Sequence, residues 1–252
     1  MLPEVSVITA VGPRSGHQRY LEQLYESICN STIDYWEWCV QIDCDPDFRT
    51  ARDLRVLESW AEKDDRVKVG FNANHSGISV TRNLAMIRAA APLVMGLDSD
   101  DMIEPDTLRR WAWIMESNPD AAYVFGTPMI LNEDKPGEDP EPEDSPLDPG
   151  RLESGSISDK WLEDRKLPLH PEGVMWRRAL ALRLGGFTAL PNGGDEALAL
   201  ALAEAFPVFH DAEPSWTHRV HGEATSRWLG GQEVRQIDGT KAMMDLHRIG
   251  EL

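Results

Sequence analysis

Three carboxylates follow an apolar segment near the middle of the chain. Asp98, Asp100 and Asp101 come directly after residues 93–97, which are Leu-Val-Met-Gly-Leu. Carboxylates this close repel one another unless a cation sits among them, and hard divalent cations prefer carboxylate oxygens. The run therefore predicts a divalent-metal site. A solvated helix start is the alternative, because acids near a helix N-terminus interact favourably with the helix dipole. Spacing alone leaves both readings open.

Two other chemistries of acidic runs fit the sequence less well. A phosphatase or phosphotransferase with an aspartate nucleophile usually carries its Asp-x-Asp after the first strand of its fold, whereas this run follows the fourth expected strand. A calcium loop needs ligands at alternating positions with a central Gly and a distal Glu, and that pattern is absent from the run.

The first half of the chain alternates strand-like and helix-like segments, which predicts an α/β fold with a mostly parallel sheet and crossover helices. The expected strands are residues 5–10, 37–42, 66–71 and 93–97, and the expected helices are residues 17–30, 50–63 and 78–90. Open α/β sheets bind ligands beyond the carboxyl ends of their strands. Asp43 and the acidic run, which follow the second and fourth strands, are therefore expected at a ligand site.

The second half is less regular. A helix is expected from Pro105, an extended segment over 123–131, helices over 176–184, 195–205 and 227–252, and short strands at Val208 and Trp216. Residues 132–149 are rich in acids and prolines with almost nothing to bury, so we expect a loop or disordered insert there. It is either a solvated tether or a lid over the site.

The composition limits the partners and the location. The 252 residues carry a formal net charge of −18, which argues against nucleic acid or an anionic membrane surface as a partner. No apolar stretch approaches the roughly 20 residues of a membrane span, so an integral membrane protein is not expected. The N-terminus has no leader pattern and the three cysteines show no paired spacing. The chain is expected to be cytoplasmic.

Several segments, taken in order, resemble the inverting GT-A-fold glycosyltransferases of family 2. Residues 5–9 resemble the opening strand and residues 37–43 the strand that ends in Asp-Asp-Gly-Ser, of which only Asp43 is kept. Residues 75–83 are similar to Gly-x-x-x-Ala-Arg-Asn, and residues 97–101 to Leu-Asp-x-Asp-Asp. Residues 185–187 match Gly-Gly-Phe, while Gly194-Asp195 stands for Glu-Asp, and residues 218–226 resemble a closing Tyr-Arg-x-His segment.

The resemblance implies a Rossmann-like GT-A fold with a mostly parallel central sheet flanked by helices, as a single domain over 1–252. Residues 1–101 would form the nucleotide-binding half and residues 102–226 the acceptor and catalytic half, followed by the C-terminal helix over 227–252.

The resemblance also implies residue roles at a nucleotide-sugar site. Asp43 would accept a hydrogen bond from the base, with Thr9, Val11 and Pro13 beside it; a capped turn is the alternative for Asp43. Arg82, early in a helix after a Gly-bearing loop, would meet phosphate oxygens, or be a surface arginine. Asp98 and Asp100 would contact the donor.

The resemblance also implies the ligands of a metal ion and the general base. Asp100, Asp101 and His221 would hold a divalent ion, Mn²⁺ or Mg²⁺, with Asp101 preferred over Asp100 and a structural histidine as the alternative for His221. Asp195 would be the general base that deprotonates the acceptor hydroxyl. Its alternative is a helix N-cap acid, and Glu196 is the neighbouring candidate base.

Together these roles predict transfer of a sugar from a nucleoside-diphosphate sugar to a hydroxyl acceptor by a metal-dependent, inverting single displacement. A UDP- or dTDP-sugar is the favoured donor, and Arg219 and Arg227 could offset the negative charge of the leaving diphosphate. Trp161 and Trp176 could line an acceptor pocket. A homodimer is left open. A sugar-phosphate nucleotidyltransferase is one alternative, although Gly12, Arg14 and Gly16 only partly imitate its phosphate loop. A non-catalytic nucleotide-binding module is the other, because two motifs are altered.

Overall fold

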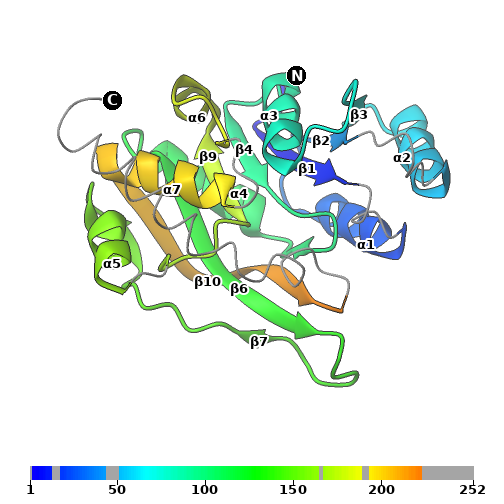
Figure 1. The fold of residues 1–252 in the computed structure, drawn as a ribbon. Helices are drawn as coiled ribbons and strands as arrows, with labels where there is room; N and C mark the ends of the chain where they lie inside the picture. Colours follow the sequence, from blue (N-terminus) through cyan, green and yellow to red (C-terminus); the bar gives the residue numbers. More distant parts are fainter. Residues whose placement is uncertain (1, 13–17, 44–50, 165–166, 189–192, 223–252) are drawn as a thin grey trace.

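The strands of the protein pair into one mixed sheet with helices on both faces (Figure 1). The computed structural model describes residues 2–12, 18–43, 51–164, 167–188 and 193–222, and these form a ten-stranded sheet. Pro13, Arg14, Gly16, residues 223–226, Arg227 and the helix expected over 227–252 lie outside the described residues.

The N-terminal half is a parallel α/β unit, as expected. Its strands are β1 (Val5–Val11), β2 (Trp36–Ile42), β3 (Val67–Phe71) and β4 (Leu93–Gly96), in the spatial order β3-β2-β1-β4. Helices α1 (Gln18–Cys29), α2 (Ala51–Lys63) and α3 (Ile78–Arg88) connect them. Every predicted boundary in this half lies within two residues of the observed one. Because β1 pairs in parallel with both β2 and β4, the carboxyl ends of these strands meet at one edge of the sheet.

The second half extends the sheet with mixed pairing, in the order β4-β9-β6-β10-β5. The long strands β6 (Tyr123–Asn132) and β10 (Val208–Val220) run parallel to each other, and β9 (Val174–Arg177) is antiparallel to both β4 and β6. The short strands β5 (Met102–Ile103), β7 (Glu141–Pro142) and β8 (Gly150–Leu152) add antiparallel edges. The helices here are α4 (Thr107–Ser117), α5 (Ser156–Asp164), α6 (Arg178–Arg183) and α7 (Gly194–Ala205).

Two hydrophobic cores lie on opposite faces of the sheet. Successive strand residues alternate between them: Val7 and Met95 belong to one core, and Ile8 and Val94 to the other, as the pleat of a strand requires. Helices α1, α2 and α4 cover the first face, and α3, α5, α6 and α7 the second. Because both faces of the central strands are covered, every residue of β1 and β2 is buried, including the polar Ser6, Thr9, Glu37 and Gln41.

Two predictions for the second half are wrong. Trp176 does not begin a helix over 176–184, because residues 174–177 form β9, and only Arg178–Arg183 is helical. Met175 and Trp176 are buried on opposite faces of the sheet, and short apolar runs do not distinguish a buried strand from a buried helix. The separate strands expected at Val208 and Trp216 are one strand, β10, whose register with β6 shifts around Pro214.

The acidic insert, residues 132–149, is mostly exposed, as expected of a polar loop. It contains β7, which pairs with Met129 and Ile130 of β6. Figure 1 shows this segment extending along the lower edge of the molecule before it returns towards α5. In the part of the chain that the structure describes, no helix is both long and apolar enough to cross a membrane.

Gly126 on β6 tests how tightly the sheet packs against α4. A Cβ at this position would lie 2.3 Å from Oγ of Ser215 and 2.7 Å from the ring of Trp111. We expect Gly126→Ala to lower the free energy of unfolding by about 1–3 kcal/mol because the buried neighbours must shift. Gly96→Ala is the matched strand control, since its Cβ would come no closer than 3.9 Å to Trp176. Urea denaturation measures both, and equal losses would contradict the packing explanation.

Candidate active site

The acidic run lies at the carboxyl end of β4, where the sequence predicted it. Leu97 continues β4 by donating its backbone N–H to the carbonyl of Ile8, and the N–H of Asp101 then turns back to the carbonyl of Asp98. β5 follows immediately and pairs with β10 through Trp216 and Thr217. The run is therefore held between β4 and the C-terminal part of β10, which brings His218, Arg219 and His221 beside it.

Arg82 connects the acidic run to the start of α7. Its guanidinium donates from Nη2 to Oδ1 of Asp98 at 2.5 Å and from Nη1 to Oδ2 of Asp195 at 2.6 Å. The side chain is only 10% exposed. Burial lowers the pKa of Arg82, but Asp98 and Asp195 raise it by more, so the pKa lies above its ordinary value. The predicted contact of Arg82 with phosphate stays a prediction; the described partners are two carboxylates.

Glycines at the start of α7 allow Asp195 to reach Arg82. Gly193 caps the helix in the left-handed conformation, with φ of 71°, which glycine adopts without steric cost. A Cβ at Gly194 would lie 2.4 Å from both Oγ of Ser79 and the carbonyl oxygen of Thr188. Gly194, which replaces the family's glutamate, therefore permits α7 to begin in close contact with α3.

Asp100 and His221 form a contact pair. Nε2 of His221 lies 2.8 Å from Oδ2 of Asp100, and the imidazole packs on Tyr20 with ring centroids 5.1 Å apart. Among the described residues, no group of three His, Cys, Asp or Glu side chains converges as a metal cage. Mg²⁺ is usually held by one or two carboxylates together with substrate phosphates, so a two-residue pair fits a metal that arrives with its ligand.

Asp101, the next residue of the acidic run, is almost fully buried. Its Oδ1 accepts the backbone N–H of Arg219 at 2.9 Å, whereas Oδ2 has no hydrogen-bond partner within the described ranges. Burial raises the pKa of Asp101 to about 7, against the opposing effect of His218. A buried, unpartnered carboxylate oxygen is favoured in its charged form by a nearby cation, so Asp101 also fits a divalent ion. Its preference over Asp100 remains untested.

His218 is the charged partner of Asp101. Its Nδ1 lies 3.6 Å from Oδ1 of Asp101. Burial lowers the pKa of His218. Asp101 and then Glu172 raise it by more than burial lowers it, so the pKa is about 9. The imidazolium therefore balances part of the acidic run at neutral pH. The sequence placed His218 in a family motif without assigning it a role; a histidine three residues before His221 was the available signal.

Arg219 holds the backbone of the acidic run rather than presenting a free cation. Its Nε donates to the carbonyl of Asp100 at 2.7 Å, while its Nη atoms donate to Glu133 and Gln23. The side chain is 3% exposed. These contacts use the guanidinium within the protein, which argues against its expected action on a leaving diphosphate.

Asp43 closes the loop that follows β3. Its Oδ1 accepts from Nδ2 of Asn72 and the backbone N–H of Ser76, and its Oδ2 accepts from the N–H of Gly77 and lies 2.9 Å from Nδ1 of His75. A carboxylate has about four acceptor positions, and these contacts fill them. The geometry therefore favours the capped-turn alternative, and contact with a base would require one partner to leave.

Thr9 and Val11 lie at the predicted edge but are engaged within the protein. Thr9 is fully buried, and its hydroxyl accepts from Nε1 of Trp38 at 3.0 Å. The carbonyl of Val11 accepts the N–H of Asp43. Their expected place beside a base stays a prediction.

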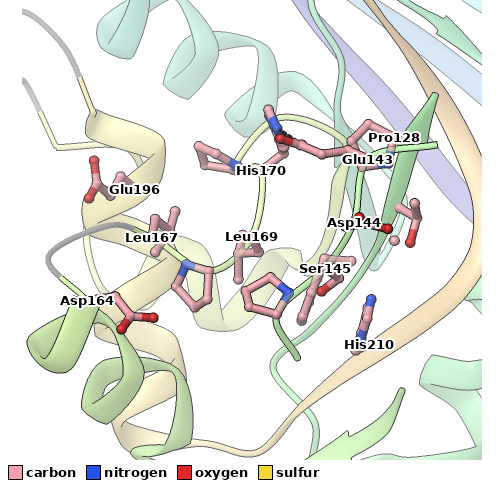
Figure 2. A pocket seen from close by; sticks show the side chains of 16 residues that line it. Pro128, Glu143, Asp144, Ser145, Asp164, Leu167, Leu169, His170, Glu196 and His210 are labelled. Atoms are coloured by element: carbon pink, nitrogen blue, oxygen red, sulfur yellow. Dashed lines mark ion pairs between the residues drawn. The ribbon is translucent and has the colours of Figure 1, made fainter. Parts of the chain in front are cut away.

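Glu196, next to Asp195, faces a separate pocket of about 870 Å³ (Figure 2). Oδ1 of Asp195 accepts the N–H of Glu196 at 2.9 Å, and Oε1 of Glu196 accepts from Nε1 of Trp161 at 3.1 Å. Trp161 and Trp176, suggested as acceptor contacts, are both fully buried core residues. The two candidate bases thus have different surroundings: Asp195 accepts a hydrogen bond from Arg82, whereas Glu196 lines the pocket.

Arg82→Gln tests whether the two-carboxylate bridge stabilises the fold. Removing one partner of a buried ion pair leaves uncompensated charge and typically costs about 3–5 kcal/mol, and we expect a loss of about 3 kcal/mol because Asp98 is partly exposed. Arg109→Gln, an exposed arginine paired with Asp106 on α4, should cost less than about 1 kcal/mol. Urea titrations measure the free energy of unfolding of both variants. A small loss of that free energy in Arg82→Gln would contradict a stabilising role for the bridge.

The chain resembles known glycosyltransferases in sequence. Over 134 residues it is 31% identical to the putative teichuronic acid biosynthesis glycosyltransferase TuaG of Bacillus subtilis (strain 168), covering 53% of this chain and 50% of that protein. Over 229 residues it is 25% identical to the chondroitin synthase of Escherichia coli, covering 89% of this chain and 30% of that protein. The chain thus spans half or less of these two relatives.

The fold has solved counterparts. TarS of S. aureus, residues 1–349 in complex with UDP, matches with a TM-score of 0.71 at 18% identity, covering 96% of this chain and 65% of that one. The mannosyltransferase PcManGT of Pyrobaculum calidifontis, in complex with GDP-Man and Mn²⁺, matches with a TM-score of 0.61 at 17% identity, covering 90% and 60%. The expected GT-A fold is confirmed by these likenesses.

The family model described as Glycosyl transferase family 2 matches residues 6–164. This match includes the strands, Arg82 and the acidic run on which the motif resemblance was based. The chain belongs to glycosyltransferase family 2.

Proposed function

We propose that the protein transfers a sugar from a nucleoside-diphosphate sugar to an acceptor hydroxyl. One observation carries the proposal: Arg82 bonds to both Asp98 and Asp195, so the acidic run and the candidate base lie within the span of a single guanidinium. Family membership supports the same activity. The parallel strand ends beside the run provide the edge at which α/β sheets bind ligands.

The diphosphate of the donor would bind at the acidic run together with a divalent ion, Mn²⁺ or Mg²⁺. Asp100 and His221 would hold the ion, with the unpartnered Oδ2 of Asp101 from the same run. When bound, the ion neutralises negative charge on the departing diphosphate. This requirement is strong in a protein with net charge −18. Of the cations that the structure describes beside the run, Arg82, His218 and Arg219 are each engaged by its acids or carbonyls.

Asp195 is proposed as the general base. The acceptor oxygen attacks the anomeric carbon as its proton passes to a carboxylate oxygen of Asp195, and the bond from that carbon to the diphosphate oxygen breaks. Attack and departure on opposite sides invert the anomeric centre. Arg82 fixes the orientation of the Asp195 carboxylate through Oδ2, while Oδ1 accepts only the N–H of Glu196 among the described hydrogen bonds.

The donor's base is proposed to be uracil or thymine, and UDP complexes of TarS support uracil. The GDP-Man complex of PcManGT makes guanine the alternative base. A homodimer and a cytoplasmic location remain predictions.

A thermal-shift series tests the donor and metal assignment. We expect UDP to raise Tm by roughly 5–10 °C in the presence of Mn²⁺ at saturating ligand, and by much less after EDTA. Asp100→Asn and His221→Ala should each remove the metal-dependent part, because each deletes a ligand of the ion. Asp106→Asn, an exposed acid on the neighbouring helix cap, is the control. A Tm shift with UDP that is the same with and without Mn²⁺, or no Tm shift at all, contradicts the assignment.

Hydrolysis of UDP-sugars in the presence of Mn²⁺ tests the base. Asp195→Asn should lower the rate by about 10²–10⁴-fold, the usual contribution of general base catalysis, while keeping the UDP-dependent Tm shift. Glu196→Gln should reduce the rate by less than about tenfold. The reverse ranking would identify Glu196 as the base. Release of pyrophosphate from a nucleoside triphosphate and a sugar phosphate would instead identify a nucleotidyltransferase.

A further inference from the structure

The pocket of about 870 Å³ beside Glu196 is bounded by segments from across the second half of the chain. Its walls come from β6, β10, the end of α5, residues 167–171, and residues 143–146 of the acidic insert. Figure 2 shows Glu196 and Asp164 on one side of the pocket and Glu143, Asp144 and His210 on the other. The insert is therefore part of a binding cavity and more than a solvated tether.

The pocket adjoins the proposed reaction centre at two points. Glu196 follows Asp195 directly, and both lie in the first turn of α7. On the other side, the ring of His170 lies 5.5 Å from that of His218, which contacts Asp101. The pocket therefore reaches the residue next to the candidate base on one side and, through His170 and His218, the neighbourhood of the acidic run on the other.

The described lining is rich in hydrogen-bond acceptors and negative charge. It includes Glu143, Asp144, Asp164 and Glu196, but no lysine or arginine. Nζ of Lys160 lies 3.0 Å from Oδ2 of Asp164, although Lys160 is not itself a lining residue. Arg165 and Lys166, next in sequence, lie outside the described residues.

His170 is the lining cation closest to these acids, and it contacts Glu143. Burial lowers the pKa of His170, but Glu172 and Glu143 raise it by more. His170 pairs with Glu143, and Lys160, from outside the lining, pairs with Asp164. Four carboxylates therefore still outnumber the cations that contact the described lining.

His210 independently indicates that the pocket binds a polar ligand. The residue is 3% exposed, its ring stacks on Phe125 with centroids 4.8 Å apart, and its Nδ1 lies 3.1 Å from the carbonyl oxygen of Asp148. A carbonyl only accepts, so Nδ1 carries a proton and donates to it. The other ring nitrogen, Nε2, has no hydrogen-bond partner within the described residues. A buried polar atom without a partner is costly unless a ligand or water supplies one.

We propose that this pocket binds the acceptor and selects a neutral or amine-bearing sugar over one that carries a carboxylate or phosphate. Hydroxyl and ammonium groups donate to the carboxylates, and a hydroxyl can also satisfy Nε2 of His210, whereas an anionic group is repelled by the carboxylates. Leu167, Leu169 and the lining prolines offer apolar contacts to the C–H faces of a sugar ring. The inference rests on the proposed glycosyl transfer, because it names the acceptor class of the same reaction.

Three methyl glycosides with one ring configuration separate charge from shape: methyl glucoside, methyl glucosaminide and methyl glucuronide. Binding to the full chain in the presence of UDP and Mn²⁺ is measured by saturation-transfer NMR titration. The glucosaminide and glucoside should bind at least about tenfold more tightly than the glucuronide, since each carboxylate near the probe contributes about threefold in a water-like dielectric. Raising NaCl from 0.05 to 1 M should narrow this gap, because salt screens charge but does not relieve a steric clash.

Charge-neutralising variants assign the effect to the pocket. Asp144→Asn and Asp164→Asn should each improve glucuronide binding by about threefold relative to the glucoside. Glu163→Gln, a 71% exposed neighbour on α5 that also pairs with Lys160, is the matched control and should leave the ratio unchanged. Equal or tighter binding of the glucuronide, a salt-independent gap, or no binding of any probe overturns the inference.

The Tm shift with UDP and Mn²⁺ is measured in the same samples. If that shift is present and the charge selectivity is absent, only the acceptor inference fails. If the shift is absent, the proposed donor site fails, whatever the glycosides do.

Discussion

The guanidinium of Arg82 lies between Asp98, at the end of β4, and Asp195, in the first turn of α7. Without a shared cation, two carboxylates brought this close in a poorly solvated site would repel each other and each would carry a desolvation cost. The single buried arginine removes that conflict and fixes the distance between the two parts of the site. The other features of the site depend on this bridge, because it holds the N-terminal parallel half against the helix that supplies the candidate base.

Short-range contacts with histidines and N–H donors also offset the negative charge of the rest of the acidic run. His218 faces Asp101, His221 faces Asp100, and Arg219 holds the backbone between them. His218 and Arg219 come from the end of β10, and His221 follows the strand directly, so this segment also supplies positive charge and N–H donors. Among the described carboxylate oxygens, Oδ2 of Asp101 is buried without a hydrogen-bond partner, so an added cation has most to gain there.

The balance of charge in the pocket differs from that at the acidic run. There the acids outnumber the described cations, and Nε2 of His210 is buried without a partner among the described residues. The two sites therefore suit different ligands: the acidic run accepts an anion only together with a metal, and the pocket accepts a donor of hydrogen bonds. Arg82 and Glu196 mark the boundary between them, because Asp195 contacts the first and directly precedes the second.

Local pattern determined much of this protein. The alternation of apolar strands and amphipathic helices predicts β1 to β4 and α1 to α3 closely, because each element is encoded by its own periodicity. The same alternation places Asp43 and the acidic run at one edge, since parallel strands share their carboxyl ends. The ordered motifs then identify the family.

Only the tertiary structure decided what those residues contact. β9 is a strand because β4 and β6 pair with it on both sides, and nothing within residues 174–177 distinguishes that outcome from a helix. The hydrogen bonds that fill Asp43, the bridge through Arg82 and the role of residues 143–146 as a pocket wall all join segments far apart in the chain. Such contacts depend on how separate elements pack, and a local sequence pattern carries no information on the partner that packing will bring.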